Sequence, residues 1–373
     1  MAAQTVADLV AVLEGGLINE DLMQQILNVD DQTLEFTNSI GSKKHSNSSF
    51  SWVMDRYKDQ NLANAWYDGQ DVNQEDNSEG QRVWNHTQTS GKEVKSTTRA
   101  DAVSTVARAN TLSYAIQKVG IELKRDVEGI MLSNQAPQID AGAGTPGLMG
   151  GLECWIDGKT LTPSLTGVSG YAQTAAIQNA ASAGEAVGGG WEHRTSDTLV
   201  APWVYTDVVP GVMKESYIKA AVTDLYKNTG SRADRTLMMS ADVNGIVSDF
   251  YFDETAKVAT LTAETNQKGP ATAMGAVNSI LTPYGMLHMV PNNLLPPSAL
   301  AAAIAGTEDS HTAFILDNSQ IEQSFLYGYR SEPLAKTGLS RRMMLHVDYS
   351  LCVKNSEALG AIRGVSPTLA MTA

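Results

Sequence analysis

The sequence predicts an α+β protein built from more than one lobe. Its 373 residues exceed what one simple core usually holds, and 42% hydrophobic with 18% charged residues is ordinary globular composition. Three features carry the prediction: a long polar stretch without periodicity, one strongly amphipathic helix after it, and a series of strands in the second half of the chain.

The N-terminal residues contain one short helical pattern. Asn19 can cap a helix in which Leu22, Ile26 and Leu27 form an apolar stripe. Residues Asn28–Asp31, three of which are polar, end this pattern. The start of the chain has no basic segment followed by a continuous apolar stretch, so we expect no signal peptide.

The next segment predicts a long two-stranded arm. Phe50–Tyr57 alternates like a strand, whereas residues 58–90 are polar and keep neither a helical nor a strand period. A loop of this length is unusual inside a compact domain. The segment is either disordered or an arm that folds against another subunit, and we expect Lys92–Thr98 to be the returning strand of such an arm.

The clearest helix is Thr111–Leu132. Its apolar residues recur at steps of three and four, and charges of both signs fill the other face, as in the pair Lys118 and Glu122. The stripe comprises Leu112, Ile116, Val119, Leu123, Val127 and Ile130.

Small residues dominate positions 138–200, apart from an apolar patch at Leu152–Ile156. We expect a loop-rich insertion there. Residues 142–147 match G-x-G-x-x-G, but the dinucleotide fingerprint needs a strand before it and a helix after it. Here a helix precedes the glycines and Pro146 interrupts them, so we interpret them as a loop.

The second half of the chain predicts a small α+β lobe followed by returning strands. A hairpin is expected about Pro283–Gly285, and Ser240 is the expected cap of the second of two helices. The predicted helices cover residues 212–228 and 240–252, and the predicted strands cover residues 236–239, 277–281, 286–290, 313–316, 321–327 and 341–353.

No catalytic, cofactor or metal site is predicted. The two cysteines, Cys154 and Cys352, form no C-x-x-C pair and are expected to be reduced, buried thiols in a cytoplasmic protein. The acidic stretch from Asp71 lacks the sixth-position Gly and twelfth-position Glu of an EF-hand, because Asp76 and Arg82 stand there. The six histidines show no metal-ligand spacing.

The net charge of −14 disfavours tight binding to a DNA duplex, which requires clustered Lys and Arg. The sequence also contains no run of about 18 apolar residues, so we expect no membrane span.

Three segments give the chain a family likeness: Trp52–Gln70, Trp84–Asn134 and Leu334–Val365. With them, the chain from about residue 50 to 365 resembles the major capsid proteins of tailed bacteriophages that have the shell fold of phage Hong Kong 97. The first segment is similar to the strand that enters the extended loop of these proteins. The second is similar to the loop exit and spine helix, and the third to the closing strands.

The resemblance implies a domain organisation for the whole chain. It predicts an N-terminal arm at 1–50, an extended loop at 51–100, and a peripheral domain at 101–204 that holds the spine helix 111–132 and the Gly/Ala-rich insertion. An axial domain at 205–330 follows, and residues 331–373 are the closing strands of the peripheral domain and the C-terminus.

The resemblance also implies a function. The chain would be a structural protein, not an enzyme, and would self-assemble into hexamers and pentamers of an icosahedral head shell. The shell would enclose double-stranded DNA without sequence-specific binding, in a virion assembled in the bacterial host cytoplasm. Portal and scaffold or decoration proteins would be further partners. The alternatives are an encapsulin-like cellular compartment shell of the same fold and an enzyme with an unrecognised site.

We expect two groups of residues at the subunit interface. One lies on the arm and comprises Trp66, Tyr67, Asp68, Asp71, Glu75, Asp76, Glu79 and Trp84; the other is basic and comprises Arg330, Lys336, Arg341 and Arg342. Aromatic residues are uncommon in disordered segments, which favours a binding role for the arm. The acidic residues either dock on the basic group of a neighbour or form a solvated loop tip.

Overall fold

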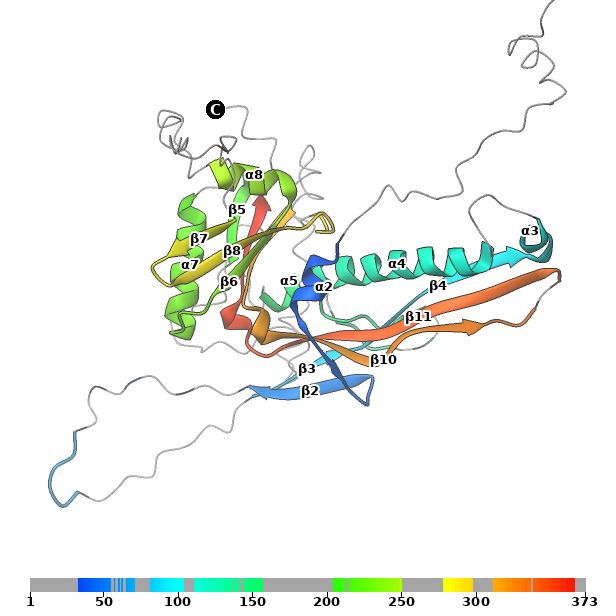
Figure 1. The fold of residues 1–373 in the computed structure, drawn as a ribbon. Helices are drawn as coiled ribbons and strands as arrows, with labels where there is room; N and C mark the ends of the chain where they lie inside the picture. Colours follow the sequence, from blue (N-terminus) through cyan, green and yellow to red (C-terminus); the bar gives the residue numbers. More distant parts are fainter. Residues whose placement is uncertain are drawn as a thin grey trace, which may run out of the picture. The chain divides into compact units, whose positions relative to one another are not determined.

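The computed structural model describes residues 33–54, 57, 60, 62, 65–70, 81–103, 111–135, 137–140, 142, 144–156, 204–211, 213, 215–249, 278–297, 311–336 and 338–365. Helices and strands are mixed along the chain, as the sequence predicted (Figure 1). The described residues belong to two compact units. One unit combines residues from Lys92–Ile121 and Ser331–Leu345, and the other those from Leu34–Gly91, Glu122–Arg330 and His346–Ala373.

The strands that the structure describes form three sheets. The four-stranded sheet has the order β1 (Gly41–Lys44), β10 (Ile321–Pro333), β11 (Ser340–Val353) and β4 (Gln88–Thr97). The two-stranded sheet pairs β2 (Ser49–Met54) with β3 (Gln81–His86). The six-stranded sheet has the order β5 (Val204–Gly211), β12 (Gly360–Val365), β9 (His311–Leu316), β6 (Arg235–Met239), β8 (Gly285–Pro291) and β7 (Ser279–Thr282).

The described helices are α2 (Glu35–Ser39), α3 (Thr98–Ala102), α4 (Thr111–Leu132), α5 (Leu152–Ile156), α7 (Glu215–Thr229) and α8 (Ala241–Asp249), with short 3₁₀ turns η5 (Asn318–Gln320) and η6 (Ser356–Ala358). The bounds of α4 are those predicted. Among its stripe residues Leu123 and Val127 are buried. No helix in the described ranges is both long and apolar enough to cross a membrane.

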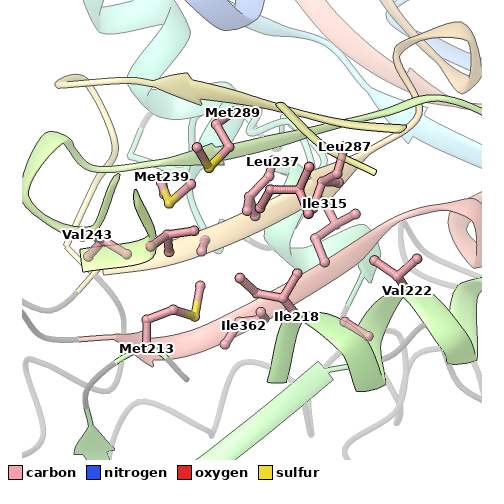
Figure 2. Packing of buried hydrophobic residues seen from close by; sticks show 14 of the residues in the cluster. Met213, Ile218, Val222, Leu237, Met239, Val243, Leu287, Met289, Ile315 and Ile362 are labelled. Atoms are coloured by element: carbon pink, nitrogen blue, oxygen red, sulfur yellow. The ribbon is translucent and has the colours of Figure 1, made fainter. Parts of the chain in front are cut away.

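The core of the six-stranded sheet packs against α7 (Figure 2). Ile218, Val222 and Leu225 recur at helical spacing on α7 and are almost completely buried. They meet sheet residues such as Ile315 and Ile362, which are also buried. The burial of each such side chain contributes about 1.5–3 kcal/mol to the stability of the folded unit.

The predicted hairpin is present as β7 and β8, joined at Pro283–Tyr284. Gly285 has a φ of +139°, and a Cβ atom there would lie 2.6 Å from the carbonyl oxygen of Ala233. Only glycine fits this position without displacing the backbone. The amide of Met286 then donates a hydrogen bond to Asp234 Oδ1 at 3.1 Å.

Three predictions about the elements were wrong. The strand that returns to β2 is β3, whereas Lys92–Thr97 belongs to β4 and the four-stranded sheet. The closing segment 331–373 is divided, because β11 lies in the four-stranded sheet but β12 pairs with β5 and β9. The apolar patch at Leu152–Ile156 is helix α5 of a packed core, not part of a loop.

Two smaller predictions also differ. Ser240 precedes α8 and its carbonyl accepts a hydrogen bond from the Asn244 amide, but its hydroxyl has no hydrogen-bond partner among the described residues. Cys352 is only half-buried, and burial raises the pKa of its thiol to about 11.

The glycines at 142 and 144 do lie in a tight turn, since the Thr145 amide donates to the Gly142 carbonyl. The predicted helix at 19–27 and residues 157–203 of the insertion lie outside the described residues.

Candidate assembly surface

The predicted arm begins with a regular base. Strands β2 and β3 are antiparallel, with Phe50 opposite Asn85 and Trp52 opposite Val83. Directly opposed residues of an antiparallel pair lie on the same face of the sheet. Phe50, Trp52 and Asn85 therefore share one face of the arm base.

Asn85 holds this face through hydrogen bonds. Its side chain is fully buried, and its Nδ2 donates to the carbonyl oxygens of Leu351 at 2.7 Å and Gly150 at 3.3 Å. Its Oδ1 accepts from the amides of Gly150 and His86, each at 2.9 Å. All four bonding positions of the amide are used, so one residue joins β3 to β11 and to the segment before α5.

A row of aromatic rings continues this contact. The ring centroids of His45 and Phe50 are 4.8 Å apart, and those of Phe50 and Trp52 are 5.4 Å apart. Trp52 then lies 5.4 Å from Trp155 of α5, which is only 1% exposed. Offset and tilted aromatic pairs at such distances add about 0.5–1.5 kcal/mol to what burial contributes.

The chain changes sheets immediately after the arm base. Thr87 separates β3 from β4, and its amide donates to the Ser48 carbonyl at 2.9 Å. The Ser350 hydroxyl donates to the His86 carbonyl at 2.6 Å. Burial lowers the pKa of His86. Burial also lowers the pKa of His45, where the nearby Asp348 carboxylate opposes the effect.

Beyond its base, the arm exposes large apolar side chains. Tyr57 is 97% exposed, Leu62 91%, Trp66 52% and Tyr67 72%. Tyr67–Gln70 form a turn in which the Gln70 amide donates to the Tyr67 carbonyl at 3.1 Å. A neighbouring molecule that covered these side chains would remove large apolar surface from water.

A second buried polar centre lies on α4. Glu128 is fully buried, and its carboxylate accepts hydrogen bonds from the Phe36 amide at 3.2 Å and the Thr37 amide at 3.3 Å. It also accepts from the Thr37 hydroxyl and from Asn292 Nδ2, each at 2.9 Å. The carboxylate thus joins the start of α2 to α4 and to the residue that follows β8.

The predicted interface residues are placed unevenly. Trp66, Tyr67 and Asp68 are exposed on the arm, and Trp84 lies in β3 opposite Ser51. Asp71, Glu75, Asp76 and Glu79 lie outside the described residues.

Of the basic group, Arg330 belongs to one unit, and Lys336, Arg341 and Arg342 belong to the other. Arg330 stacks over the Tyr327 ring at 4.9 Å, and Lys336 and Arg341 are exposed. Arg342 pairs with Glu93 of its own chain. The hydrogen bond from Arg342 lowers the pKa of Glu93. Arg342 therefore already has an acidic partner within its own unit. Within the described ranges, no three His, Cys, Asp or Glu side chains cluster as metal ligands would.

The comparison with protein families shows which family the chain belongs to. The SU10 major capsid protein family matches residues 3–366 of this chain. The chain belongs to this family. It is a phage major capsid protein with the shell-forming function of that class, which confirms the likeness seen in the sequence.

Solved capsid structures agree with the fold of this capsid protein. It is similar to the capsid of a native GTA particle, with a TM-score of 0.59 and 11% identity over 96% of this chain and 98% of that chain. The capsid of an empty GTA particle gives 0.55 and 12% identity over 96% and 99%. Mycobacterium phage Bobi gives 0.50 and 11% identity over 97% and 99%. No curated protein matches the chain.

Three residues that organise the capsid protein's arm base and α2 were not predicted: Asn85, Glu128 and Trp155. Asn85 and Glu128 are polar, and nothing in their surroundings in the sequence indicates burial. Trp155 did carry a signal, because the run Leu152, Trp155 and Ile156 has helical spacing. The small residues on both sides of this run concealed it.

Proposed function

We propose that this capsid protein assembles into hexamers and pentamers that close an icosahedral head shell around double-stranded DNA. The arm is the main contact between neighbouring subunits. The observation that supports this is the exposure of Tyr57, Leu62, Trp66 and Tyr67 on an arm whose base is held in place. Water is a poor solvent for such a set of side chains, and a neighbouring subunit can cover them.

The assembly needs no chemical step, and we propose that the protein is not an enzyme. Head-to-tail contacts close into rings when each contact repeats the same rotation. Individual contacts can be modest, because a subunit held by several neighbours leaves only when all of them release it. The net charge of −14 disfavours adhesion to the enclosed DNA. Portal and scaffold or decoration proteins are the further partners, and assembly takes place in the bacterial host cytoplasm.

Charge is a second part of the proposed contact. The arm carries Asp68, Asp71, Glu75, Asp76 and Glu79 with no Lys or Arg between them. These residues dock on the exposed Lys336 and Arg341 of a neighbour, while Arg342 contributes less because Glu93 already pairs with it. Each exposed pair contributes under about 1 kcal/mol, and its repetition around the shell makes the effect measurable.

Light scattering in rising sodium chloride tests the charge contact. The Debye length shrinks to about 3 Å at 1 M salt, so wild-type assembly should weaken as salt rises. The double variant Asp71→Asn/Asp76→Asn should assemble weakly throughout and respond little to salt. The control Asp126→Asn/Asp242→Asn removes the same charge from exposed positions on α4 and α8 and should follow the wild type. Identical salt curves for the wild type and the arm variant would contradict the docking and leave the tip as a solvated loop.

A further inference from the structure

The two faces of the arm base differ. Phe50, Trp52 and Asn85 face the body of their unit, whereas Val53, the next residue along β2, is 67% exposed. The face that carries Trp52 therefore determines the angle at which β2 leaves the body.

Trp52 rests on a ring that is itself fixed. Trp155 is 1% exposed, and its neighbours Leu152 and Ile156 on α5 are fully buried. Asn85 holds Gly150, two residues before α5, through two hydrogen bonds. A side chain that packs against the Trp155 ring is therefore positioned by the buried core and not by a loop.

Ring packing alone makes this contact. The indole nitrogens of Trp52 and Trp155 have no hydrogen-bond partner among the described residues. A phenyl ring can therefore replace the Trp52 indole, whereas an aliphatic side chain keeps the apolar bulk but loses the ring geometry.

We propose that the tilted packing of the Trp52 ring against the Trp155 ring is a positioning contact for assembly, which fixes the direction of the arm before a neighbouring copy binds it. The inference rests on the proposed function of the arm as the contact between subunits. A binding element that is already held in its bound direction loses less conformational freedom on docking. A substitution that loosens the contact between Trp52 and Trp155 should therefore weaken assembly more than it lowers the stability of the subunit.

The test compares Trp52→Leu, Trp52→Phe and a control, Val53→Thr, which changes the exposed face of the same strand at nearly constant volume. The measurements are the protein concentration at half-maximal assembly, by light scattering, and the melting curve of the unassembled subunit. Trp52→Leu should raise that concentration about fivefold or more, a loss of order 1 kcal/mol in RT ln K. Trp52→Phe should reach half-maximal assembly at a concentration within about twofold of the wild type, since an aromatic ring still packs against Trp155.

A mixture of wild-type and Trp52→Leu subunits distinguishes a lost positioning contact from a misfolded subunit. A folded Trp52→Leu subunit still accepts wild-type arms, so an equimolar mixture should yield shells that contain both proteins, which a misfolded subunit would not enter. The inference is overturned if Trp52→Leu assembles at the wild-type concentration, if Trp52→Leu and Trp52→Phe behave alike, or if the mixed shells exclude the Leu variant. A wild-type protein that forms no shells would instead contradict the proposed function itself.

Discussion

Replacing Glu128 by Gln should destabilise the subunit although the two side chains have nearly the same shape. The carboxylate accepts four hydrogen bonds and donates none. An amide offers one oxygen and two N–H donors in the same space. Its nitrogen must therefore face groups that are themselves donors.

The structure allows the size of this effect to be worked out. The amide oxygen is best placed where Oε1 accepts from the Phe36 amide and from Asn292. The amide nitrogen then faces Thr37, whose hydroxyl can turn to accept, but whose backbone N–H loses its partner. One unpaired buried donor costs about 1–3 kcal/mol, and hydrogen bonds to a neutral acceptor are weaker than those to a charged one. The lower cost of burying a neutral group offsets part of this loss, which leaves about 2 kcal/mol.

Thermal unfolding of the unassembled subunit measures the effect. A loss of about 2 kcal/mol should lower the melting midpoint by about 2–3 °C. Asp242→Asn removes the same charge from an exposed position of α8 and should change stability by less than about 1 kcal/mol. Equal midpoints for Glu128→Gln and Asp242→Asn would refute the reasoning, because they would show that the hydrogen bonds to Glu128 contribute nothing beyond its charge.

Two further predictions concern the hairpin and pH. Gly285→Ala should destabilise the subunit by about 2–4 kcal/mol because of its φ and the Ala233 carbonyl, whereas Gly245→Ala, in the open middle of α8, should stabilise it by up to about 1 kcal/mol; unfolding in urea that ranks them otherwise would contradict this. Burial lowers the pKa of His86 in the folded state, so the unfolded chain binds more protons and stability should fall as the pH drops below about 6.5. Melting curves between pH 7.5 and 5.5 should show a smaller pH slope for His86→Phe than for the wild type, and an unchanged slope would show that His86 is not the source.

The sequence predicted helix α4 and the β7–β8 hairpin, because both depend on residues that are close together in the chain. Helix α4 followed from its apolar spacing, and the β7–β8 hairpin followed from Pro283 and Gly285, whose backbone preferences act within the turn itself. The membership of strands in sheets did not follow. The chain passes from β3 to β4 at Thr87 without any Gly or Pro to mark the change, so a single longer arm was the natural interpretation. The pairing of β12 with β5 joins residues more than a hundred positions apart, which no local pattern reports.

For the same reason, the sequence indicates some features of the candidate assembly surface and conceals others. Trp66 and Tyr67 are conspicuous in a polar segment, and both are exposed. Arg342 was assigned to a neighbour because its pairing with Glu93 depends on two strands that are distant in the sequence. Asn85 and Glu128 gain their roles only from tertiary contacts, so their importance became visible only in the folded chain.

Electron microscopy of the purified full-length protein under assembly conditions tests the central claim most directly. The account predicts closed icosahedral shells, with the arm of each subunit in contact with a neighbour and with Trp66 and Tyr67 covered there. Open aggregates without symmetry, or closed shells in which these side chains face solvent, would contradict it.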